Sequence, residues 1–179
     1  MEPNLVEDDY LVARAQDGFL DAFELLVMRH QDGAYRFALR MLDDPQDAQD
    51  ATQEAFVDAW RGLAGFTGAS SFRTWFYRIV VHRCLRHQRR RREGAHPLPA
   101  ELPGGPRPDE VVEARSRTAA LRAAIAALPT ELRTPLVLHQ FEQFSYADVA
   151  AMLGVRPATV RGRIYRARQE LVAAMRGWE

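Results

Sequence analysis

The apolar residues of this chain recur mainly at spacings of three and four, the spacing that gives an amphipathic helix one apolar face. Residues 20–42, for example, contain such a stripe: Phe23, Val27, Ala34, Phe37 and Met41. Runs of β-branched residues are few, and no segment alternates apolar and polar residues as a half-buried strand does. The pattern therefore predicts an all-α fold.

One segment interrupts the helical pattern. Residues 95–108, AHPLPAELPGGPRP, contain five of the ten prolines and a Gly-Gly pair. Proline ends helices and does not fit the interior of a sheet, so this composition is typical of a linker. We therefore predict two small helical domains, residues 1–93 and 109–179, joined by a Pro/Gly-rich linker at 94–108.

Three helices are expected before residue 62, near 8–16, 20–42 and 46–61, and the third follows Asp43-Asp44-Pro45, a helix-starting signal. One face of the third helix carries an acidic ridge, which consists of Asp47, Asp50, Glu54 and Asp58. A narrow face of four alanines lies beside it. Because Arg61 is the only cation of that helix, we expect the four acids to be nearly unpaired. The ridge is then either a solvated face or a surface for a basic partner.

Charge is unevenly distributed along a chain whose formal net charge is zero. Residues 1–60 contain fourteen Asp and Glu against four Arg, whereas residues 61–92 contain nine Arg and no acid. Residues 155–179 form a second basic block, with six Arg against two acids. Segregated charge of this kind indicates separate partners for the acidic and the basic segments.

The first basic block contains a predicted helix, FRTWFYRIVVHRCLRHQRRRR, that begins at residue 72 after a loop at 62–71. Its apolar stripe includes Phe72 and Phe76, and Ser70 or Ser71 can cap its start. Another face combines an aromatic ring with cations: Trp75, Arg78, His82 and Arg86. Aromatic rings stack on unpaired bases and Arg neutralises phosphates, so this face suits melted nucleic acid. The alternative is that Trp75 belongs to the core and the arginines only keep the helix soluble.

The second basic block contains a helix-turn-helix pattern. Helices are expected near 109–127 and 131–143, after which Ser145 and Asp148 resemble a capping box. A short helix then runs to 153, Gly154 supplies the turn, and a longer basic helix begins near Pro157. Arg side chains on such a second helix read guanine edges and bind phosphates. The alternative is a helical hairpin used only for contacts with proteins.

Other functional classes find little support in the sequence. A length of 179 residues with 47% hydrophobic content suits one ordinary domain or two small ones. His82, Cys84 and His87 are too few and too divergent on a helix for a zinc site, and no nucleophile and base form a catalytic constellation. We expect no enzyme activity, no metal and no cofactor. The absence of a membrane-length apolar run, and an acidic N-terminus where a signal peptide is basic, predict a cytoplasmic protein without membrane insertion.

Three motifs in this order resemble those of extracytoplasmic-function (ECF) sigma factors, a compact two-domain class of bacterial RNA polymerase sigma subunits. DAQDATQEAFVDAW at 47–60 resembles their polymerase-docking helix. FRTWFYRIVVHRCL at 72–85 is similar to their promoter-melting helix, and GVRPATVRGRIYRAR at 154–168 to the helix that recognises the −35 element. The resemblance covers nearly the whole chain.

The resemblance implies a role for three groups of residues. The residues it implies for docking on the β′ coiled coil of core polymerase are Asp47, Asp50, Gln53, Glu54 and Phe56. Those it implies for contacts near a flipped base of the −10 element are Phe66, Ser70, Ser71, Arg73, Trp75, Arg78, His82, Arg86, Arg89 and Arg90. Those it implies for contacts with the −35 element are Arg156, Thr159, Arg161, Gly162, Arg163, Tyr165, Arg166 and Arg168.

The implied partners are core RNA polymerase, through its β′ coiled coil and β flap, promoter DNA, and an anti-sigma factor. The sequence departs from the family at His82, where Asn is frequent, and at Ala158 and Gly162, where Gly and Ser are common. Two other hypotheses remain: a conventional transcription factor that binds duplex DNA without polymerase, and an enzyme with an accessory DNA-binding domain.

Overall fold

The computed structural model describes residues 7–94 and 110–176. The first half contains α1 (Asp8–Gln16), α2 (Leu20–Leu42), α3 (Pro45–Gly62), a short 3-10 helix (Leu63–Gly65) and α4 (Phe72–Gly94). The second half contains α5 (Glu110–Ala127), α6 (Thr130–Gln140), α7 (Tyr146–Leu153) and α8 (Pro157–Met175). The two described ranges contain no strand, which confirms the all-α fold with two helical regions. Nearly all of the predicted linker, 95–108, lies outside the described residues.

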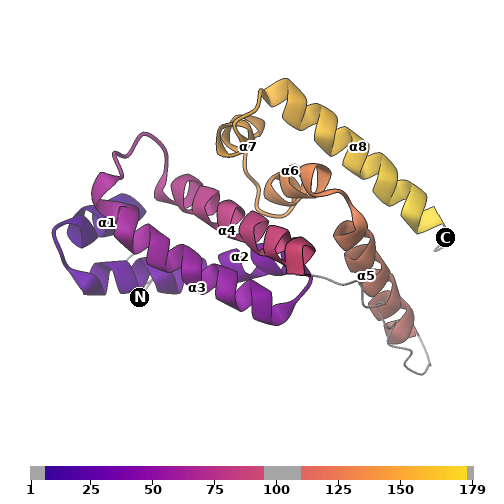
Figure 1. Cartoon of the computed structure of the whole chain (residues 1–179), viewed down its shortest axis with the longest axis horizontal. Coiled ribbons are helices and arrows are strands. Elements are labelled where there is room, and N and C mark those ends of the chain that lie inside the picture. Colours follow the sequence, from indigo (N-terminus) through magenta and orange to yellow (C-terminus); the bar gives the residue numbers. More distant parts are fainter. Residues whose placement is uncertain (1–6, 95–109, 177–179) are drawn as a thin grey trace.

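In the first half, α2 packs against α1, α3 and α4 (Figure 1). The alanine face of α3 is fully buried, because small side chains let two helix backbones approach closely: Ala48, Ala51, Ala55 and Ala59. Aromatic rings fill the space between α2, α3 and α4, with Phe56 stacked on Phe76 at 4.4 Å between ring centroids. The Asp44 side chain accepts a hydrogen bond from the Asp47 amide, and Pro45 occupies the first turn of α3, as the sequence predicts.

In the second half, α8 lies along the outside, with α6 and α7 between it and α4 (Figure 1). Its apolar stripe, Val160, Ile164 and Ala167, is buried against α6 and α7. The halves contact each other directly, because α6 and α5 pack on α2 and α7 packs on α4.

The packing of α1 on α2 includes a buried histidine. His30 Nε2 lies 2.7 Å from Asp8 Oδ2, and the ring packs beside Phe72 at 5.4 Å between centroids. Burial lowers the pKa of His30 below its ordinary 6.5, although the neighbouring Asp8 carboxylate acts in the opposite direction. The folded protein therefore favours the neutral ring.

This burial predicts a pH-dependent stability. The folded state binds fewer protons at His30 than the unfolded state. The contribution of His30 to the free energy of unfolding is therefore complete above about pH 6.5 and is lost as pH falls toward the lowered folded-state pKa. We expect urea unfolding followed by circular dichroism to give a smaller free energy of unfolding at about pH 5.5 than at about pH 7.5. His30→Gln should reduce this difference, and the exposed control His82→Gln should retain it. A wild-type free energy that is equal at both pH values would contradict the assignment.

Candidate protein and nucleic-acid interfaces

The acidic ridge lies on one face of α3, but its carboxylates have partners on α4. Arg83 donates from Nε and Nη2 to both oxygens of Asp58, at 2.5 and 2.6 Å. Its Nη1 donates to Glu54 at 2.9 Å. This bidentate bonding lowers the pKa of Asp58, with hydrogen bonding from Arg83 as the largest cause.

The N-terminal part of the ridge also faces side chains of α4, at longer distances. His87 lies between two carboxylates, 3.8 Å from Asp47 and 3.4 Å from Glu54, and Arg91 lies 3.5 Å from Asp47. The expectation of nearly unpaired acids is therefore wrong. Spacing within one helix shows which acids share a face, but it does not show which neighbouring helix supplies cations.

Two polar residues of the predicted docking set retain open positions on this face. Asp50 accepts a hydrogen bond from Gln46 at 3.0 Å within α3, and Gln53 is exposed. Together with Val57, they line a shallow hollow that also includes Glu54, Arg61 and Arg83. The ridge thus presents a partly neutralised surface with Asp50 as its least compensated carboxylate.

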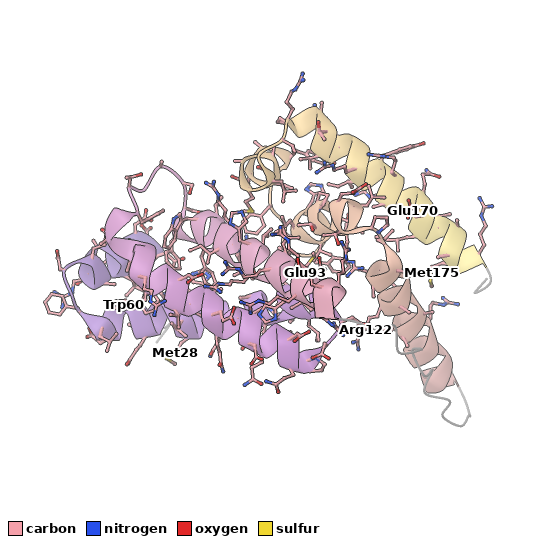
Figure 2. The ribbon with its side chains drawn as sticks, in the orientation of Figure 1. Met28, Trp60, Glu93, Arg122, Glu170 and Met175 are labelled. Carbon is pink, nitrogen blue, oxygen red and sulfur yellow. The ribbon has the colours of Figure 1, made fainter. Side chains whose placement is uncertain are left out.

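Phe56 requires a correction. Its side chain is 9% exposed and stacks on Phe76 in the core, so it supports the ridge from beneath and is not a surface contact for a partner. Val57 and Trp60 are not among the predicted docking residues, yet their side chains are 47% and 40% exposed on the outer side of α3. Met28 on α2 is also exposed, and Figure 2 shows Met28 and Trp60 at the outer surface of the first half. The signal in the sequence was that Val57 and Trp60 are apolar residues that lie off the alanine stripe of this helix.

The predicted −10 residues gather at the N-terminal end and along the outer face of α4. Trp75 is half-buried, with its ring 5.0 Å from that of Phe66 and 5.8 Å from that of Phe72. Gln16 fixes the preceding loop by donating to the carbonyl oxygens of Leu63 and Phe66, at 2.9 and 2.8 Å. Trp75 therefore packs on the core and also leaves part of its ring accessible to solvent, which is compatible with both alternatives.

The cations of this face are open to solvent. The exposed predicted residues are Arg78, His82, Arg86, Arg89 and Arg90 together with Ser70 and Ser71. The capping residue is Ser71, whose hydroxyl oxygen accepts a hydrogen bond from the Thr74 amide at 3.1 Å. Arg73 differs from the other −10 residues, because its guanidinium contacts the second half.

The candidate metal ligands do not assemble. Cys84 is fully buried, and burial raises the pKa of its thiol to about 12. Such a thiol stays protonated and is unsuited to bind zinc. Among the described side chains, those of residues 7–94 and 117–176, no three His, Cys, Asp or Glu are grouped as metal ligands.

The helix-turn-helix prediction is confirmed. The Ser145 hydroxyl accepts a hydrogen bond from the Asp148 amide at 3.1 Å and caps α7. Gly154 ends α7 at φ 65°, a left-handed conformation that glycine adopts without a steric penalty. The Val155 amide then donates to the Ala150 carbonyl, which fixes the turn before α8.

Most of the predicted −35 residues lie on the open side of α8. The exposed ones are Arg156, Thr159, Arg161, Gly162, Tyr165, Arg166 and Arg168, and Arg163 is half-buried. Tyr165 is 65% exposed, although aromatic side chains are usually better covered. Arg168 donates to Gln140 of α6 at 2.7 Å, and Arg161 lies 5.7 Å from the ring of Tyr146. α8 therefore presents a cationic face with one exposed aromatic ring.

In the described part of the chain, no helix is long and apolar enough to cross a bilayer.

Comparisons with known proteins agree with this arrangement. The family model for Sigma-70 region 2 matches residues 26–93, and the model for Sigma-70, region 4 matches residues 118–171. The RNA polymerase sigma-H factor of Pseudomonas aeruginosa is 36% identical, with 94% of each chain covered. The ECF RNA polymerase sigma-E factor of Escherichia coli is 33% identical, with 92% of each chain covered.

Solved structures show the same fold. A structure of CnrH in complex with the cytosolic domain of CnrY matches with a TM-score of 0.75 and 30% identity, covering 95% of this chain and 97% of that one. The sigma factor RpoE in complex with the anti-sigma factor NepR, from Bartonella quintana, matches with a TM-score of 0.67, covering 86% and 96%. At 22% identity, this second likeness shows the fold alone. The chain belongs to the extracytoplasmic-function group of the sigma-70 family and is a promoter-recognising RNA polymerase sigma factor.

Proposed function

We propose that this protein binds core RNA polymerase, recognises the −35 and −10 elements of a promoter, and promotes separation of the two DNA strands at the −10 element. The observation that carries the proposal is the division of surfaces. An acidic ridge with exposed apolar neighbours lies on α3, whereas exposed cations with accessible rings lie on α4 and α8. One chain thus offers separate surfaces to a basic protein partner and to nucleic acid.

Core docking is assigned to the ridge of α3. Asp50 and Gln53 are its open polar groups, and Val57 and Trp60 supply apolar area beside them. The proposed partner is the β′ coiled coil of polymerase, with Asp47 and Glu54 held in place by α4. The β flap is the proposed partner of the second half.

Melting is assigned to the loop before α4 and to the outer face of that helix. An extracted base can stack on the accessible part of the Phe66 and Trp75 pair, an interaction worth about 1 to 3 kcal/mol per base. Arg78, Arg86 and Arg89 then neutralise the phosphates of the separated strand. The energy of these contacts offsets the cost of extracting a base from the duplex, which is about a few kcal/mol.

Duplex recognition is assigned to α8. Thr159 and Arg161 lie on the exposed side of its first turns, where recognition helices contact base edges and phosphates. The chain itself performs no chemistry in this proposal, because binding energy alone carries its function and polymerase supplies catalysis. The place of action is the cytoplasm, and an anti-sigma protein that covers these surfaces is the proposed regulator.

Run-off transcription tests the proposal directly. Core polymerase with and without this protein should be compared on a genomic promoter library. We expect protein-dependent transcripts from a subset of promoters, and weak binding of the free protein to duplex DNA. A conventional transcription factor would instead bind duplex DNA specifically without polymerase. If no promoter gives protein-dependent transcripts and the protein also fails to bind core polymerase, the proposal is wrong.

The docking surface gives a narrower prediction. Asp50→Arg places a cation on the least compensated position of the ridge and should weaken binding to core polymerase at least about tenfold, or 1.4 kcal/mol. Asp32→Arg makes the same charge change at an exposed position of α2 and should have little effect. Fluorescence anisotropy with labelled protein gives both affinities, and circular dichroism checks the fold. If the two variants bind core equally well, the ridge is only a solvated face.

The role of α8 predicts a selective loss. Arg161→Ala in the holoenzyme should reduce binding to promoters by about 1 to 3 kcal/mol, because one base or phosphate contact is removed. The control Arg176→Ala removes an exposed Arg just after α8 and should change binding less. Promoter titrations at several salt concentrations separate the two kinds of contact, since loss of a phosphate contact lowers the salt slope by about one. Equal affinity of both variants would remove Arg161 from the interface.

A further inference from the structure

We propose that the loop between α6 and α7, Phe141–Phe144, is a latch that holds the second half on α4 and competes with nucleic acid for Arg73. The latch itself rests on the contacts between the halves, whereas the identity of the competitor rests on the proposed function. Its central residue is Glu142, which lies in the second half and binds side chains of the first.

Glu142 is a nearly buried carboxylate, with 7% of the residue exposed. The Tyr77 hydroxyl donates to its Oε2 at 2.8 Å, and Arg73 Nη2 lies 3.7 Å from the same oxygen. On the other side, Arg40 Nη1 lies 3.6 Å from Oε1. A buried carboxylate requires such partners, and all three come from α2 and α4 of the first half.

Arg73 is held by more than charge. Its Nη2 donates to the backbone carbonyl of Glu142 at 2.7 Å, and its guanidinium carbon lies 4.1 Å from the ring centroid of Phe144. The Phe144 ring in turn meets Tyr77 edge-on at 4.9 Å. A guanidinium that is stacked and hydrogen-bonded in this way must give up these contacts to bind a phosphate in full.

The first half is shaped to receive the latch. A Cβ added at Gly33, in the interior of α2, would lie 2.8 Å from the Tyr77 hydroxyl oxygen. Glycine destabilises a helix interior relative to alanine, so its presence here permits the close approach of that hydroxyl. Burial and the neighbouring Glu142 raise the pKa of Tyr77, which therefore remains a donor.

The loop is preformed on its own side as well. The Glu142 and Phe144 amides donate to the carbonyls of Val137 and Leu138, and Gln143 between them has φ 60°. His139 Nδ1 lies 2.8 Å from the Phe144 carbonyl oxygen. The side chains of Glu142 and Phe144 therefore contact α4 from a loop that is already ordered, so the contact costs little conformational entropy.

The closed arrangement conflicts with simultaneous contact at both promoter elements. Elements named −35 and −10 lie about 25 base pairs apart, which is about 85 Å at 3.4 Å per base pair. A compact chain of 179 residues has a radius of gyration of about 16 Å. The halves must separate for the proposed function, and separation breaks the contacts of Glu142 and frees Arg73.

The test uses the full chain and Glu142→Arg, which places a cation between Arg40 and Arg73. Its matched control is Glu131→Arg, the same charge change at an exposed position of α6. Tyr77→Phe removes the hydroxyl donor and keeps the ring in the core, and circular dichroism confirms that every variant remains helical. Small-angle X-ray scattering of the protein alone should give a larger radius of gyration for Glu142→Arg, a smaller increase for Tyr77→Phe, and the wild-type value for Glu131→Arg.

Binding to a short fluorescein-labelled single-stranded DNA of mixed sequence tests the competition. We expect Glu142→Arg to bind about tenfold more tightly than Glu131→Arg, the change that one recovered charged contact gives. Adding Arg73→Ala to Glu142→Arg should abolish this gain. Equal affinities of the two charge variants would overturn the competition for Arg73, and equal radii of gyration would overturn the latch.

These outcomes are independent of the run-off experiment. Scattering requires neither polymerase nor DNA, so an expanded Glu142→Arg variant supports the latch even if no promoter responds to the protein. Transcription with an unchanged radius of gyration would support the proposed function and remove the latch.

Discussion

The hydrogen bonds from Arg83 to Asp58 and Glu54 bring the acidic and the basic segments of the chain together. Because α3 carries the acids and α4 the cations, the two helices attract each other along their length, and their apolar stripes meet beneath the charges. The remaining surfaces depend on this pairing. It fixes which carboxylates stay open on α3, and it leaves Arg78, Arg86 and Arg89 of α4 facing solvent.

The side chains of α4 therefore face four different surroundings: the core, α3, solvent and the second half. Phe76 and Val80 fill the core, Arg83 and His87 bind α3, Arg78 and Arg86 face solvent, and Arg73 and Tyr77 meet the second half. A helix with such a division has no single apolar face and no single polar face. The proposed core docking, strand separation and closure of the chain would thus all involve the single helix α4. A partner bound near one face of α4 therefore lies close to the residues on its other faces.

Much of this fold could be predicted from local signals in the sequence. Asp44 and Pro45 start α3, and Ser145 and Gly154 bound α7, because caps and turns depend on residues within one helical turn. α6 ends at Gln140 rather than near 143, because Gln143 has a left-handed φ of 60° and the Glu142 and Phe144 amides donate to the carbonyls of Val137 and Leu138. Neither Pro nor Gly marks this turn in the sequence.

The candidate sites divide in the same way. Spacing correctly placed the four acids of α3 on one face, but it did not reveal that Arg83 and His87 would pair with them. It also could not tell that Phe56 is turned to the core, because a docking motif records position and not burial. Val57 and Trp60 were missed for the converse reason: apolar residues are expected inside, and their exposure depends on which neighbours cover α3.

The chemistry of the contact between the halves suits a closure that a partner can reverse. If the closed form outnumbers the open form a hundredfold, the apparent affinity for a partner of the open form falls a hundredfold, or about 2.8 kcal/mol. The ion pairs of Glu142 with Arg40 and Arg73 are long, at 3.6 and 3.7 Å, and both arginines are about a third exposed. Such pairs contribute modestly, because water screens them and competes for them. A fully apolar interface of the same extent would hold the halves more tightly, whereas a carboxylate surrounded by partly solvated arginines gives up its partners once polymerase and DNA offer others.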